Sequence, residues 1–124
     1  TSSSSYGLYV SGAIYSTSNI TAYSDARKKE NVVTVDNALE KVNNLRGVYY
    51  NRIDDEKKTK QIGVIAQEIN EVVPEVVTYA EDVDEYGVTY GNLAGLFIEA
   101  FKEQTKVIND LKQKIEELES KLNK

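Results

Sequence analysis

The sequence predicts an α+β fold in which short helices and two β-hairpins are followed by a long C-terminal helix that forms a coiled coil. Three patterns predict it: apolar residues repeat in heptads near the C-terminus, four short β-rich runs lie in the middle, and amphipathic stretches separate them. The 124 residues, 40% hydrophobic and 28% charged, suffice for one domain with a modest core. Oligomerisation would help to complete such a core.

Residues 1–23 carry no charge and consist mainly of Ser, Thr, Tyr and Gly with isolated aliphatic residues. The alternation Leu-Tyr-Val-Ser at 8–11 and the β-formers that follow it predict short strands. So few residues cannot bury a core of their own. We therefore expect the end of a longer β-structure, or a strand that needs a partner chain.

Two short helices and two hairpins are predicted between this segment and the C-terminal helix. Asp36 or Asn37 can cap a helix that stops near Gly47, and Asn37 with Glu40 fits the spacing of a capping box. Pro74, the only proline, ends a second helix that begins near residue 66. The predicted hairpins pair 47–53 with 61–66 and 75–80 with 86–90.

Asn92 is expected to cap the C-terminal helix, whose heptad positions define an apolar seam. The a positions are Ala94, Phe101, Ile108, Ile115 and Leu122, and the d positions are Phe97, Gln104, Leu111 and Leu118. Eight of these nine residues are apolar, which is typical of a coiled coil. The first half of the seam is expected to dock on the chain's own body, and the part beyond Ile108 to self-associate. Ile at a with Leu at d favours dimers, but the aromatic residues and Gln104 leave the strand number open.

Several function classes are excluded by composition. The absence of Cys and His removes thiol nucleophiles and the usual zinc ligands, so we expect no metal and no cofactor. A net charge of −5 argues against a nucleic-acid partner, and no apolar run approaches the length of a membrane span. The tip at 82–87 imitates a calcium loop, but Tyr86 and Leu93 stand where oxygen ligands are required.

The stretch 24–29, Ser-Asp-Ala-Arg-Lys-Lys, has two interpretations. Ser24 or Asp25 could cap a helix, but cations stand where a capping box needs Glu, so a turn suits these residues better. Alternatively, Ser24 is a nucleophile with a lysine base, which requires burial or a nearby cation. In a regular helix Lys28 shares the face of Ser24, whereas Lys29 reaches it only from a folded-back turn. The spacing leaves both lysines open.

The stretch "YSDARKKEN" resembles the Ser-Asp-x-Arg-x-Lys motif of the intramolecular chaperone auto-processing family. Such domains lie at the C-terminus of bacteriophage tail fibres, tail spikes and neck appendages, and also occur in myelin regulatory factors. Three further stretches are similar to the family in the expected order, so that the resemblance covers about residues 20–122. They are "ALEKVNNLRGVYYN", "QIGVIAQEINEVVPEVV" and "GVTYGNLAGLFIEAFKEQTKVINDLKQKIEEL".

The resemblance implies a homotrimer that helps the preceding fibre domain of the same chain to fold and then cuts itself off as a serine peptidase. It places the scissile bond at Tyr23–Ser24, with Ser24 as nucleophile and Lys29 as base of a Ser-Lys dyad. Asp25 and Arg27 match the motif and are assigned only a supporting role. The residues expected to form the trimer contact are Phe97, Phe101, Ile108, Leu111, Ile115, Leu118 and Leu122.

The resemblance also implies a division of the chain and a place of action. Residues 1–23 would be the end of the fibre shaft, 24–92 the chaperone body and 93–124 the coiled-coil helix. Assembly would occur in the bacterial host cytoplasm; the fibre part would stay in the virion and the chaperone fragment would be released. The alternative is a non-cleaving trimerisation or host-adhesion module of a fibre tip. A transcription-factor processing domain is disfavoured by the fibre-like N-terminus and the lack of a basic region.

Overall fold

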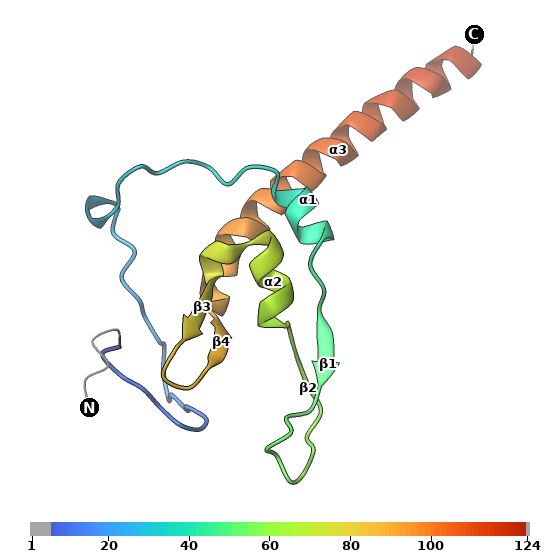
Figure 1. Ribbon diagram of the computed structural model, residues 1–124. Helices are drawn as coiled ribbons and strands as arrows, with labels where there is room; N and C mark the ends of the chain where they lie inside the picture. The colour runs from blue at the N-terminus through green and yellow to red at the C-terminus, as the bar shows by residue number, and fades with distance from the viewer. Residues whose placement is uncertain (1–5, 124) are drawn as a thin grey trace. The chain divides into compact units, whose positions relative to one another are not determined.

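The computed structural model describes residues 6–123 (Figure 1). The chain packs as two compact units, one ending at Val32 and the other beginning at Val33. The predicted division after residue 23 follows the expected cleavage and not the packing of the chain, and it stays a prediction.

In the first unit, the described residues 6–32 contain a single regular element, the 3-10 turn η1 (Ala26–Lys28). The short strands predicted in residues 6–23 are not formed there, so this prediction is wrong for the single chain. Leu8, Ile14 and Ile20 lie exposed, and a strand needs a hydrogen-bonded neighbour that the described residues of this unit do not provide.

The second unit contains both predicted short helices. Helix α1 (Ala38–Asn43) follows Asn37, which adopts a left-handed conformation with φ 49° and makes no capping bond with its side chain. The predicted capping box is therefore not formed. Instead, the Leu39 N–H donates to Glu103 Oε2 at 2.9 Å, so the cap comes from a residue 64 positions further along the chain.

Helix α2 (Ala66–Val72) ends before Pro74, as predicted, and continues into the 3-10 turn η2 (Pro74–Val76). Proline disfavours helical geometry in the residue before it, and Val73 leaves the helical region with φ −132° and ψ 67°. The turn directs the chain from α2 into the second hairpin.

Both predicted hairpins are formed, with strands shorter than the sequence suggested. In the first, β1 (Val48–Tyr50) pairs antiparallel with β2 (Gln61–Gly63). In the second, β3 (Val77–Ala80) pairs with β4 (Glu85–Val88). The two hairpins are separate two-stranded sheets, and the second packs against α2.

The long helix α3 (Leu93–Leu122) follows the 3-10 turn η3 (Tyr90–Asn92) and begins directly after Asn92. Asn92 makes no capping bond with its side chain, so the prediction that it caps the helix is wrong. Helices α1 and α2 lie beside its first half, and its second half extends beyond them (Figure 1). The buried core collects residues of all three helices and of the turn between α2 and β3. Its members are Ala38, Ile69, Val73, Val76, Leu93, Leu96 and Ala100.

The first half of α3 has two apolar faces instead of one. Leu93, Leu96 and Ala100 are buried against the body, whereas the seam residues Phe97 and Phe101 are exposed. The expectation that the first half of the seam docks on the chain's own body is therefore wrong. A neighbouring stripe of α3 makes that contact, and the seam stays accessible over the described length of the helix.

Candidate active site

The turn η1 is held together by Asp25. Its Oδ1 atom accepts a hydrogen bond from the Arg27 N–H at 2.8 Å, and its carbonyl oxygen accepts from the Lys28 N–H at 3.0 Å. The Lys29 N–H then donates to the Ala26 carbonyl oxygen at 3.1 Å. A side-chain acceptor followed by one backbone turn is the standard capping arrangement, with Asp25 rather than Ser24 as the cap.

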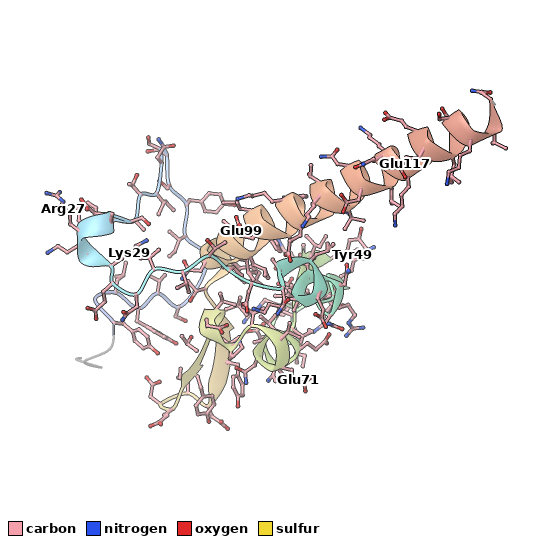
Figure 2. All side chains as sticks on the ribbon, turned by 90° about the horizontal axis from the view of Figure 1, so that it is seen from above. Arg27, Lys29, Tyr49, Glu71, Glu99 and Glu117 are labelled. Carbon is pink, nitrogen blue, oxygen red and sulfur yellow. The ribbon has the colours of Figure 1, made fainter. Side chains whose placement is uncertain are left out.

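Lys29 leaves the turn in an extended conformation, with φ −122° and ψ 144°. Its side chain folds back, and Nζ donates a hydrogen bond of 2.6 Å to Ser24 Oγ. The turn thus brings Lys29, and not Lys28, to Ser24, which is the arrangement expected of a folded-back turn rather than a regular helix. Figure 2 shows Lys29 and Arg27 on this short turn.

The Arg27 guanidinium group donates hydrogen bonds to both oxygens of the Asp25 carboxylate. Nε lies 3.1 Å from Oδ1, and Nη2 lies 2.8 Å from Oδ2. These bonds lower the pKa of the Asp25 carboxyl, chiefly through the Arg27 side chain, and raise the pKa of Arg27. The predicted motif residues therefore fall into two pairs, Ser24 with Lys29 and Asp25 with Arg27.

The site is open to solvent in the single chain. Tyr23, Ser24 and Lys29 are exposed, and a shallow hollow is lined by Tyr23, Asp25, Arg27 and Lys28. Among the hydrogen bonds of residues 6–123, none reaches the Tyr23 carbonyl oxygen. The geometry can carry a proton between Ser24 and Lys29, but it supplies neither burial nor an oxyanion donor.

The acidic tip that imitates a calcium loop belongs to the second hairpin. Asp84 accepts a hydrogen bond from the Tyr79 hydroxyl, which raises the pKa of that tyrosine. The Tyr79 and Tyr86 rings pack with centroids 4.8 Å apart. Within the described part of the chain, no three acidic, His or Cys side chains gather where they could hold a metal ion.

The helices are also too polar or too short for a bilayer. Across residues 6–123, no helix combines the length and the apolar composition that crossing a membrane requires. The long helix α3 carries charged residues from Glu99 onward.

Residues 24–78 match the Peptidase_S74 family, the chaperone of endosialidase. This match confirms the resemblance to chaperone domains of phage fibres that the sequence indicated. The match begins at Ser24 and includes the motif, α1 and the first hairpin.

The relatives are bacteriophage tail fibre proteins. The chain is 35% identical to the long tail fiber protein Gp37 of Enterobacteria phage K3 and to that of Enterobacteria phage T2, over 92% of its residues. It is 28% identical to Gp37 of Salmonella phage S16 over 95% of its residues. The chain spans only 10% and 9% of the first two relatives and 17% of the third.

Proposed function

We propose that this chain is a C-terminal intramolecular chaperone of a phage fibre that assembles as a homotrimer and releases itself by cutting the Tyr23–Ser24 bond. The observation that carries the proposal is the 2.6 Å contact between Lys29 Nζ and Ser24 Oγ inside the Ser-Asp-x-Arg-x-Lys motif. The family match and the fibre relatives support a fibre-associated chaperone and a self-cleaving peptidase.

The proposed cleavage needs only atoms of the chain and one water molecule. Neutral Lys29 takes the Ser24 hydroxyl proton while Oγ attacks the Tyr23 carbonyl carbon. The Tyr23–Ser24 C–N bond breaks, and the Ser24 amine accepts the proton from Lys29. Water then hydrolyses the ester between Tyr23 and Ser24 Oγ, which frees the Tyr23 carboxylate and restores the hydroxyl.

A lysine accepts the hydroxyl proton of Ser24 only in its neutral form, so the reaction requires an uncharged amine at the Lys29 Nζ that contacts Ser24 Oγ. Burial removes water from an ammonium group and favours its neutral form. We propose that packing of three chains supplies this burial and the missing oxyanion donor. Cleavage would then follow assembly, and an unfolded chain would stay whole.

The accessible seam of α3 supports the trimer part of the proposal. Its apolar members from Phe97 to Leu122 are exposed in the single chain, and the described core residues leave them uncovered. Under this proposal the body and helix, residues 24–124, form the chaperone, and residues 1–23 stay with the fibre in the virion. Assembly in the host cytoplasm belongs to the same proposal.

Denaturing mass spectrometry of the expressed 124-residue chain tests the cleavage. We expect two species, 1–23 and 24–124, in the wild type, and only the whole chain in Ser24→Ala and Lys29→Met. Lys28→Met is the matched control, because Lys28 is the lysine that helical spacing would have selected, and it should leave cleavage intact. A whole wild-type chain under conditions that permit assembly would favour the non-cleaving trimerisation or host-adhesion module instead.

A further inference from the structure

All charged residues of the first unit lie in one short stretch. Within residues 6–32 they are Asp25, Arg27, Lys28, Lys29 and Glu30. Apart from Lys29 itself, two are acidic and two are basic, so the charges that surround the proposed base cancel. This balance favours a lysine that must lose a proton, because an uncompensated carboxylate would stabilise the ammonium form.

Building on the proposed self-cleavage, we propose that Arg27 is a positioning residue that neutralises the Asp25 carboxylate beside the Ser24–Lys29 pair. Asp25 is the next residue after Ser24, whose hydroxyl oxygen touches Lys29 Nζ. Both carboxylate oxygens of Asp25 accept from the Arg27 side chain. The acid can therefore shape the turn while its charge is cancelled.

The two tasks of Asp25 are separable by chemistry. Its Oδ1 atom accepts from the Arg27 backbone N–H, which closes the turn and requires only an oxygen acceptor. Its negative charge is bound by the guanidinium group and is not needed for that cap. The Arg27 side chain lowers the pKa of the Asp25 carboxyl, so the carboxylate is charged at every pH where a lysine base can work.

Asp25→Asn keeps a capping oxygen and removes the charge, whereas Arg27→Gln leaves the carboxylate without its counter-charge. We expect Arg27→Gln to slow cleavage at pH 7 by about two- to fivefold and to move the rising limb of the pH–rate profile up by about 0.3–0.7 units. Asp25→Asn should move the limb down by a similar amount. The double variant should return close to the wild-type midpoint.

The opposite signs separate charge balance from mere structural support. If the contact between Asp25 and Arg27 only shaped the turn, both single variants would slow cleavage without moving the midpoint of the pH–rate profile. This result would overturn the proposal. Screening gives a second readout: in about 1 M salt the Debye length falls to about 3 Å, so both displacements should shrink. Displacements that persist unchanged in salt would also contradict the proposal.

The chain offers a matched control in the first hairpin, where Arg52 makes the same two-ended contact with Asp54 at 2.8 Å for each bond. Arg52→Gln should leave the cleavage profile unchanged. If the wild type does not cleave at all, the self-cleavage proposal fails separately. The charge balance is then tested on Ser24→Ala, in which the pH midpoint of the Lys29 ε-carbon NMR shift should rise when Arg27→Gln is added; an unmoved midpoint would refute it.

Discussion

Placing aspartate at two seam positions, Ile108→Asp together with Ile115→Asp, should abolish both assembly and cleavage. Both residues occupy a positions of α3 and expose about half of their surface, 46% and 53%. In a parallel trimer each position brings three copies together, so each substitution would gather three carboxylates in one apolar layer. Buried like charges without partners are strongly unfavourable.

The magnitude follows from the exposed apolar surface. The seven apolar seam residues from Phe97 to Leu122 are 42–84% exposed, which amounts to about four whole side chains per chain. At about 1.5–3 kcal/mol for each buried side chain, the seam contributes about 6–12 kcal/mol per chain before the cost of association. Losing the two isoleucines removes about one side chain per chain, or about 5–9 kcal/mol per trimer. Association should weaken by at least about a thousandfold.

Sedimentation and denaturing mass spectrometry measure the two consequences on the same sample. The matched control is Gln113→Asp with Ser120→Asp, which places two aspartates on the same helix at positions opposite the seam. We expect the control to assemble and cleave like the wild type, whereas the seam variant stays monomeric and whole. Circular dichroism of both variants checks that the body is folded.

One outcome would refute the coupling between assembly and chemistry. If the seam variant is monomeric by sedimentation and still cleaves at the wild-type rate, the exposed Ser24–Lys29 pair is sufficient by itself. A seam variant that remains trimeric would instead refute the assignment of the interface to α3.

Three further predictions concern the stability of the body. Glu103→Ala removes the cap that α3 supplies to α1 and should cost about 1–2 kcal/mol in denaturant unfolding, with exposed Glu117→Ala near zero. Ile69 is the only fully buried large side chain among the described residues. Ile69→Ala should lower the free energy of unfolding by about 2–5 kcal/mol because it leaves a cavity, whereas Ile69→Val should lower it by about 1 kcal/mol. Arg46 donates a hydrogen bond to Glu68 and lowers the pKa of that carboxyl. The pair therefore stabilises the fold at pH values above the ordinary carboxyl pKa. This contribution is lost as the pH falls through the lowered pKa of Glu68. Arg46→Gln should therefore flatten the acid side of a stability-versus-pH curve measured by thermal unfolding.

Local sequence signals predicted the elements because their causes are local. Pro74 ends α2 whatever surrounds it, and Asn92 precedes α3 as its pattern indicates. The cap of α1 could not be predicted in this way. Asn37 and Glu40 have the correct spacing, but the acceptor that reaches Leu39 belongs to Glu103 on another helix.

The two faces of α3 show a second limit of pattern analysis. The heptad pattern identifies Phe97 and Phe101 as seam residues. It does not identify the neighbouring stripe of Leu93, Leu96 and Ala100, which makes the contact with the body. Both stripes fit a helix, and only the packing of α1 and α2 decides which one is covered. The stripe that stays exposed is the heptad seam, which continues to Leu122 near the end of the helix.

The spacing of residues 24–29 could not decide between Lys28 and Lys29, because the decision depends on the backbone geometry of the turn. Helical spacing favours Lys28, but η1 stops after one turn and its last hydrogen bond comes from Lys29 itself. From an extended residue the long side chain reaches back to Ser24. Asp25 causes this by capping so short a turn, and Arg27 holds Asp25. The hydrogen bonds of Asp25 and Arg27 thus shape the turn that brings Lys29 to Ser24, and under the proposed function this arrangement adds no net charge beside the pair.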